Sequence, residues 1–257
     1  MNRVADLEMI DLKTSSQLER MRRAGRIVSQ VLEVLRRSVR PGMCTRDLDR
    51  IAEEEIQRRG GQAAFKGYRG FPATLCASVN EEVVHGIPSE RKLEEGDIIG
   101  LDLGAVMEGY YADAAITVPV GTVSKEVQEL LSVTERSLRL GIEQARAGHS
   151  LTDISHAVQQ EAEQHGYSVV REFVGHGIGA QLHEPPQVPN FGRPGFGPTL
   201  KAGMMLAIEP MVNMGLPAVR ILRDGWTAVT QDGSWSAHFE HTVAITEGSP
   251  EILTKHA

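Results

Sequence analysis

The feature that most constrains the fold is an internal repeat, in which two segments of the chain align without a gap. The segment RPGMCTRDLDRIAEEEIQRRG, from Arg40, aligns with RAGHSLTDISHAVQQEAEQHG, from Arg146. Helix caps and amphipathic spacing alone can produce part of this match. The match continues, however, because LEEGDIIGLD aligns with LKAGMMLAIE, and DAAITVPVG aligns with EHTVAITEG. We therefore expect one domain over residues 1–257, built from similar halves at about 12–122 and 123–253 that pack about a pseudo-two-fold axis.

Each half is expected to contain a pair of helices, because apolar residues recur there at helical spacing between recognisable caps. The predicted helices run from Ser15 or Ser16 to about Arg40, from Thr45 to Gly60, from Ser124 past Leu138, and from Thr152 to Gly166. Short strand-like runs lie between the two helix pairs. The pattern predicts an α/β (α+β) fold in which strands of both halves share a sheet and helices cover its outside.

The charge and the cysteines exclude several classes of protein. A formal net charge of −7 gives no overall positive field, so a specific nucleic-acid reader is not expected. Cys44 and Cys76 form no Cys-x-x-Cys motif, which argues against a disulfide framework and a cysteine zinc site. Asp6, Glu8 and Asp11 interrupt any apolar signal region, and no run reaches the roughly 18 apolar residues of a membrane span. A reducing cytoplasm and no membrane association are expected.

Two aspartates lie in the segment IIGLDLGAVMEGYYADAAITV, which is typical of a strand hairpin. With the turn centred on Met107 and Glu108, Asp102 is expected to lie directly opposite Asp113. Opposed strand residues have Cβ atoms only about 4.5–5.5 Å apart, and like charges at that distance are destabilising. Apolar neighbours on both strands make solvent a poor source of compensation, so a shared proton or a bound cation is expected.

The repeat adds two further acids, because it places Glu209 at the position of Asp102 and Glu240 at the position of Asp113. A single acid in a strand is often a turn-side or ion-paired residue, but four carboxylates cannot share a buried pocket without strong positive charge. No lysine or arginine lies within these motifs. Two divalent cations would supply the charge, and a mostly oxygen ligand set with imidazole suits Mn²⁺, Fe²⁺, Co²⁺ or Zn²⁺.

Three histidines are candidates for the same pocket. His176 lies in FVGHGIGAQLHEPP, where alternate glycines permit a close approach of backbone or ligand. His183 follows seven residues later, and His85 ends a strand-like run in NEEVVHGIP. Each of these, taken alone, is more often a structural histidine with satisfied hydrogen bonds than a metal ligand. Solvated helix surface or chain end is the expectation for His149, His156, His165 and His256.

The chain resembles the bacterial type I methionine aminopeptidases. The matching blocks include FKGYRGFPATLCASVNEEVVHGIP, GDIIGLDLGAVMEGYYADAAITVPVG, VGHGIGAQLHEPPQVPN, LAIEPMVN, DGWTAV and SAHFEHTVAIT, in the expected order from about Asp11 to Leu253. The resemblance implies the pita-bread fold, with a curved, mostly antiparallel central sheet. It also implies a single catalytic domain that removes the initiator methionine from nascent chains whose second residue is small, using a water activated by two metal ions.

The resemblance also implies a role for each matching position. The dinuclear metal ligands would be Asp102, Asp113, His176, Glu209 and Glu240, with Asp113 and Glu240 bridging. Glu209 would also transfer protons, while His85 and His183 would orient the substrate and stabilise the reacting amide. The methionine pocket would be formed by Tyr68, Phe71, Cys76 and Trp226. The departures from the family pattern are Phe65, Arg69 and Leu182.

Two rival functions remain open from the sequence. A proline-specific aminopeptidase or dipeptidase would share the fold, but those enzymes commonly carry an additional amino-terminal domain. A binding protein that has lost catalysis is opposed by the intact ligand positions. The basic run at Arg20, Arg22, Arg23 and Arg26 could touch ribosomal RNA transiently, although a solvated face is the preferred interpretation. A monomer is expected, and no role is assigned to the extension before the first helix or to residues 190–198.

Overall fold

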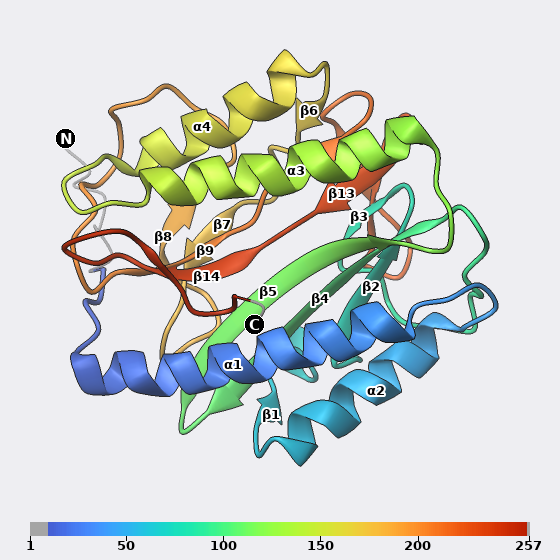
Figure 1. The fold of residues 1–257 in the computed structure, drawn as a ribbon, viewed down its shortest axis with the longest axis horizontal. Helices are drawn as coiled ribbons and strands as arrows, with labels where there is room; N and C mark the ends of the chain where they lie inside the picture. Colours follow the sequence, from blue (N-terminus) through green and yellow to red (C-terminus); the bar gives the residue numbers. More distant parts are fainter. Residues whose placement is uncertain (1–9, 256–257) are drawn as a thin grey trace.

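The computed structural model describes residues 10–255 (Figure 1). Predictions that concern Asp6, Glu8 and His256 therefore lie outside the described residues. Between residues 10 and 255, no helix is both long enough and apolar enough to cross a membrane.

The predicted helices are confirmed, and their ends lie where capping residues stand. They are α1 (Ser15–Ser38), α2 (Thr45–Arg58), α3 (Lys125–Gln144) and α4 (Leu151–Gln164). Thr14 and Gln17 form a capping box at the start of α1, and Ser124 accepts a hydrogen bond from the backbone of Val127 at the start of α3. These side chains satisfy backbone N–H groups that have no partner within the helix. The helices therefore begin at residues that the sequence identifies.

The strands pair only in antiparallel fashion wherever pairing is described. They are β1 (Gln62–Ala63), β2 (Leu75–Val79), β3 (Glu82–Val84), β4 (Ile98–Met107), β5 (Tyr110–Pro119), β6 (Ser168–Val169), β7 (Gly175–Gly177), β8 (Glu184–Val188), β9 (Met205–Ile208), β10 (Met211–Asn213), β11 (Val219–Ile221), β12 (Ala228–Thr230), β13 (Ser236–His238), β14 (His241–Ala244) and β15 (Glu251–Ile252). A short 3₁₀ turn, η1, spans Tyr68–Gly70. Two groups carry most of the site: β4 pairs with β1, β2 and β5, and the order β15-β14-β9-β7-β8 forms the other. The α/β class with antiparallel sheets is confirmed, while the division into halves at 12–122 and 123–253 stays a prediction.

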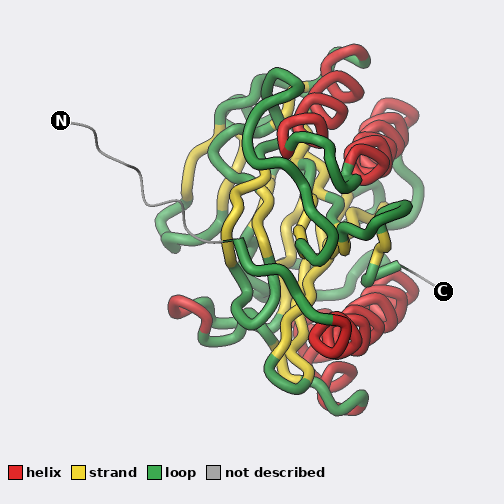
Figure 2. Tube along the Cα trace, turned by 90° about the vertical axis from the view of Figure 1, so that its left-hand side faces the viewer, coloured by secondary structure: helices red, strands yellow, loops and turns green. Residues whose placement is uncertain are grey.

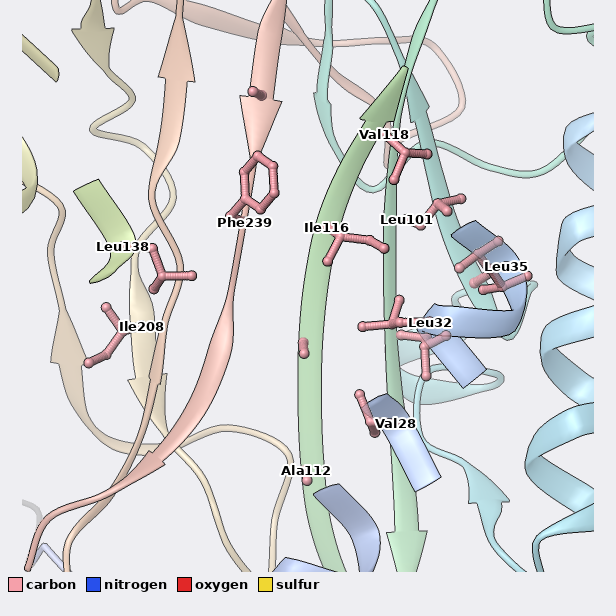
Figure 3. Close-up of a cluster of buried hydrophobic side chains, with 14 of the residues drawn as sticks. Val28, Leu32, Leu35, Leu101, Ala112, Ile116, Val118, Leu138, Ile208 and Phe239 are labelled. Carbon is pink, nitrogen blue, oxygen red and sulfur yellow. The ribbon is translucent and has the colours of Figure 1, made fainter. Parts of the chain in front are cut away.

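The helices all lie on one face of the strands, and η1 lies on the other (Figure 2). Along α1, Val28, Leu32 and Leu35 recur at helical spacing, are fully buried, and point toward β4 and β5 (Figure 3). Full burial of one such side chain contributes about 1.5–3 kcal/mol, so this layer is a large part of the core. The α3 layer contributes Leu138 on the other side of the same cluster. The helices therefore fill one face with core, which leaves the face of η1 for a pocket.

The hairpin of β4 and β5 has a different register from the predicted one. Asp102 pairs with Ala115, and Asp113 pairs with Gly104. The prediction that the two aspartates lie directly opposite one another is therefore wrong. They are diagonal neighbours on one face of the hairpin, because Asp113 and Ala115 are two residues apart on the same strand.

The cause of this register is the conformation of the turn. The two turn residues are Glu108 and Gly109, with φ angles of 51° and 77°. A two-residue hairpin turn of this type needs positive φ at both positions, and glycine adopts it without steric cost. A turn at Met107 and Glu108 would place methionine, which has no such tolerance, in the left-handed region. The position of the glycine therefore sets the register.

Strand β5 also joins the two sheet groups, because it meets the segment between β13 and β14. The backbone N–H of Glu240 donates to the Ala115 carbonyl at 2.9 Å, and the Asp113 N–H donates to Thr242 Oγ1 at 3.1 Å. Thr242 Oγ1 in turn donates to Asp113 Oδ1 at 3.1 Å. These contacts place Asp113 and Glu240, one acid from each half of the chain, beside each other.

Candidate active site

One pocket of about 160 Å³ is lined by all the site residues that the sequence predicts. These are Tyr68, Phe71, Cys76, His85, Asp102, Asp113, His176, His183, Glu209, Trp226 and Glu240. The three departures from the family pattern, Phe65, Arg69 and Leu182, also line it. A larger groove of about 670 Å³ runs along α3 and contains none of the five predicted metal ligands. The smaller pocket is therefore the candidate active site.

The pocket floor is a cage of acids around one histidine. Nε2 of His176, on β7, lies 3.6 Å from Asp113 Oδ2 and 3.5 Å from Glu209 Oε1. Ligand atoms of Asp113, His176 and Glu240 all lie within 4.8 Å of one another, and all three residues are buried. Asp102 Oδ1 is buried and has no hydrogen-bond partner. The five predicted ligands thus line one pocket, and candidate donor atoms of three of them lie within 4.8 Å of one another.

The four neighbouring carboxylates of the cage repel one another when they are ionised, and a nearby positive charge would offset this repulsion. Burial raises the pKa values of Asp102, Glu209 and Glu240 well above those of ordinary aspartate and glutamate side chains. Neighbouring carboxylates raise each of these pKa values further. Burial also raises the pKa of Asp113, to about 6. Within residues 10–255, no lysine or arginine forms an ion pair with any of the four. A divalent cation would offset this repulsion, so the donor set fits a metal site.

His176 is held in the form that a metal ligand needs. Its Nδ1 lies 2.9 Å from the Gly177 carbonyl oxygen, so Nδ1–H donates there and the lone pair of Nε2 faces the carboxylates. Burial lowers the pKa of His176 to about 4, which keeps the ring neutral at physiological pH. The imidazole is therefore fixed in orientation and in protonation state.

The glycines around His176 are required by close packing of β7 between β8 and β9, as the sequence predicts. A Cβ atom on Gly177 would lie 2.1 Å from the Pro185 carbonyl oxygen, and one on Gly175 would lie 2.3 Å from the Ala207 carbonyl oxygen. Real Cβ atoms do not approach backbone this closely. A side chain at either position would push β7, and His176 with it, out of place.

Gly177→Ala is expected to lower the free energy of unfolding by about 1–3 kcal/mol, because the added methyl group forces a backbone shift in a packed sheet. Urea denaturation measures the change. Gly248→Ala is the matched control, since the nearest atom to a Cβ there is 3.8 Å away. Equal stability of the two variants would show that β7 tolerates displacement.

His183 stands at the mouth of the pocket and is tied to Tyr68. Its Nδ1 lies 2.9 Å from the Tyr68 hydroxyl, and the two rings are stacked with centroids 5.3 Å apart. The ring centroids of His183 and His176 are 4.1 Å apart. Burial lowers the pKa of His183 to about 4. A neutral imidazole with a fixed ring is thus placed beside the cage.

His85 lies among three aromatic rings, of which Phe71 and Trp226 line the pocket with it. The His85 ring meets Trp226 and Phe173 edge-on, at centroid distances of 6.3 Å and 5.4 Å. Phe71 meets Trp226 in the same way, at 5.1 Å. His85 adopts a φ of 60°, which is uncommon for a residue other than glycine and occurs often at functional sites. The wall is apolar apart from this one imidazole.

Two residues beside the cage were missed by sequence reasoning. His238 Nε2 is buried without a hydrogen-bond partner and lies 3.9 Å from Glu209 Oε2. Asn190 Nδ2 donates to the Glu209 carbonyl at 2.9 Å, which gives the start of the unassigned segment 190–198 a structural role. A signal for His238 exists in SAHFEH, because residues two apart in an extended segment face the same side, and Glu240 follows by two. Asn190 has no such signal.

The other described histidines that were predicted at the surface lie outside the pocket. His165 is exposed, and its Nε2 lies 3.0 Å from an Arg136 guanidinium nitrogen. His149 and His156 are half-buried, and Nδ1 of His149 is buried without a hydrogen-bond partner. These two histidines are thus partly covered, and neither lines the pocket.

Comparison of the sequence and the structure with known proteins identifies the family of this chain. The model of metallopeptidase family M24 matches residues 19–247. Methionine aminopeptidases from Clostridium perfringens and Bacillus subtilis are 54% and 53% identical, each match covering 96% of this chain and 99% and 100% of theirs. The crystal structure of a Thermotoga maritima methionine aminopeptidase superimposes with a TM-score of 0.95 at 47% identity, over 96% of this chain and 100% of that one. The chain therefore belongs to metallopeptidase family M24, among the methionine aminopeptidases.

Proposed function

We propose that this protein is a metal-dependent exopeptidase that removes the initiator methionine from nascent polypeptides whose second residue is small. The observation that carries the proposal is the convergence of four buried carboxylates and a neutral His176 beside an apolar wall, in one pocket of about 160 Å³. The names of its relatives, methionine aminopeptidases in two bacteria, support the same activity.

Two divalent ions, Co, Mn, Fe or Zn, would be held by Asp102, Asp113, His176, Glu209 and Glu240. Asp113 and Glu240 come from different halves and lie beside each other at the junction of the sheets, so both would contribute oxygen donors to the same metal site. When bound, such ions polarise a carbonyl and lower the pKa of a coordinated water. The fit rests on charge, since the acids have no other cationic partner among the described residues.

Three side chains of the pocket would have separate roles in peptide hydrolysis. Glu209, whose pKa burial raises, would accept a proton from the attacking water and return it to the amide nitrogen as the peptide bond breaks. His183 would donate a hydrogen bond from Nε2 to the substrate carbonyl oxygen, since its Nδ1 faces the Tyr68 hydroxyl. In this arrangement Nδ1 of His183 accepts a hydrogen bond from the Tyr68 hydroxyl. His85, which lines the same pocket beside Trp226, would contact the scissile nitrogen.

The aromatic wall would hold the methionine side chain. A flexible thioether packs well against aromatic rings, with contacts of about 0.3–1.5 kcal/mol. Phe71 and Trp226 supply these rings, Tyr68 a third, and Cys76 a small buried side chain. The small volume of the pocket leaves little room for a bulky second residue.

The proposal also covers the oligomeric state of the enzyme, its location in the cell and its contact with the ribosome. We place a monomer in the reducing cytoplasm, where Cys44 and Cys76 would stay free, as they are in the structure. A transient contact with the ribosome through the basic run of α1 has weaker support. Arg22 pairs with Glu251, and Arg23 pairs with Glu108, so much of that charge is neutralised within the chain. This pairing favours the solvated-face interpretation.

The experiment that tests the activity compares three substrates at saturating Mn²⁺ or Co²⁺. Methionine release from Met-Ala and Met-Pro peptides, with no release of alanine from Ala-Pro, is the expected result. Cleavage of Ala-Pro would identify a proline-specific enzyme. Binding of peptides without any release of an amino acid would identify a protein that has lost catalysis.

His85→Ala is expected to lower kcat about 10–100-fold while the bound metal per chain stays the same. The imidazole is neutral, because burial lowers its pKa, and it lines the pocket beside Trp226 rather than among the predicted metal ligands. Steady-state kinetics with a metal count on the same sample gives the answer. An unchanged kcat would remove His85 from the reaction.

A further inference from the structure

Arg69 is the single lysine or arginine among the residues that line the pocket. It lies in η1 with a φ of 49°, between Gly67 and Gly70, whose φ angles are 85° and 90°. This backbone path is uncommon for arginine and fixes the direction in which its side chain leaves the chain. The guanidinium carbon lies 5.4 Å from the centroid of the Tyr68 ring.

The guanidinium has no anionic partner. Within residues 10–255, no carboxylate forms an ion pair with it, although neighbouring Lys66 pairs with Glu53 at 2.7 Å. Its interaction with Tyr68 is with a ring face, which leaves the five N–H donors of the guanidinium free. An unpaired arginine on a rigid turn, stacked on a tyrosine, is a preformed site for a carboxylate.

Arg69 lies at the point where a bound substrate would leave the pocket. Of the residues that line the pocket, Arg69 and His183 are the exposed ones, and they mark its mouth. An exopeptidase holds the first residue at the buried end, so the rest of the chain leaves through this mouth. Residues beyond the scissile bond therefore pass Arg69 as the chain leaves, each adding about 3.3 Å when the chain is extended.

We propose that Arg69 is a specificity determinant that favours substrates with a carboxylate on the third or fourth residue. The proposal rests on the function proposed above and adds a preference to it. The partner is an acidic side chain or, in a short peptide, the terminal carboxylate. An exposed ion pair of this kind corresponds to a preference of about two- to fivefold in kcat/KM, which falls as salt is added.

The test uses Met-Ala-X-X peptides with amidated ends, where X is Glu, Gln or Lys. The readout is the ratio of kcat/KM for Glu over Gln peptides, in which any general loss of activity of a variant cancels. The wild type is expected to show a ratio of about two to five. Arg69→Asn, chosen because asparagine tolerates positive φ, should bring the ratio to about one, and Arg69→Glu should favour Lys peptides.

Lys66→Gln is the control, since it removes a neighbouring charge that does not line the pocket, and its ratio should equal that of the wild type. Met-Ala-Ala with a free or an amidated end separates the two sources of carboxylate. A wild-type ratio of one at low salt, or a ratio that survives in Arg69→Asn, overturns the proposal. Failure of the wild type to release methionine from the Gln peptide would instead contradict the proposed function.

Discussion

Glu209→Gln is expected to lower kcat for methionine release by about 10²–10⁴-fold, the range of a lost general acid–base group. Glu209 lies at the end of β9 with Oε1 facing His176 Nε2 at 3.5 Å and Oε2 facing His238. Glutamine keeps the shape of the side chain but cannot accept the proton. The change should appear in kcat more than in KM, because the aromatic wall that binds methionine is untouched.

The matched control for this variant is Glu163→Gln, an exposed glutamate on α4 outside the pocket, which should retain the wild-type rate. Steady-state kinetics at saturating metal checks both variants. Metal counts separate a loss of proton transfer from a loss of metal. Activity of Glu209→Gln within a factor of a few of wild type, at equal metal content, would assign the proton to another group.

The acids of the metal-free cage are expected to make the folded protein less stable as the pH rises above about 4, where the carboxyl groups of an unfolded chain ionise. Burial raises the pKa of Asp102, Glu209 and Glu240, so above that pH these groups bind protons in the folded state that they release on unfolding. Stability then falls with pH, by about 1.4 kcal/mol per pH unit for each proton of difference. Saturation with Mn²⁺ or Co²⁺ should remove most of this fall and raise the Tm at pH 8 by about 5–10 °C.

Histidines oppose this trend only at lower pH. Burial lowers the pKa of His176 and His183 to about 4, below the value of about 6.5 in an unfolded chain. Between about pH 4 and 6.5 the unfolded state therefore binds more histidine protons, which makes stability rise with pH. Above about pH 7 these rings are neutral in both states, so they no longer contribute to the pH dependence of stability.

Thermal melts of metal-free protein at several pH values, with and without added metal, measure this prediction. Glu240→Gln removes one of the acids, so the melting temperature of this metal-free variant should depend less on pH than that of the wild type. A metal-free protein whose stability does not change between pH 7 and 9 would show that the cage is compensated by some other means.

The sequence predicted the helices well, because helices depend on local signals, and the repeat singled out acids that line one pocket. Thr14 and Ser124 are caps that bind the next turn of their own helices, and no distant contact is needed to recognise them. The alignment that matches Glu209 with Asp102 follows from the sequence alone. Convergence of these acids in one pocket agrees with that alignment.

Features that depend on tertiary contacts were less accessible. The hairpin register was missed because the sequence allows several two-residue turns. The turn that forms places Glu108 beside Gly109 at a positive φ angle, which a residue other than glycine seldom adopts. Asn190 binds the Glu209 backbone from a loop 19 residues away in the chain. The role of Arg69 depends on its lack of an ion partner, which only the three-dimensional arrangement reveals.

The most direct test of the metal cage follows metal binding and methionine release in one titration of metal-free protein with Mn²⁺ or Co²⁺. No release without metal, a rate that rises with occupancy, and saturation at two ions per chain are predicted. Asp113→Asn, which alters an acid within 4.8 Å of both His176 and Glu240 ligand atoms, should bind fewer ions and lose activity. Full methionine release in the presence of a strong chelator, or unchanged metal binding by Asp113→Asn, would contradict the account.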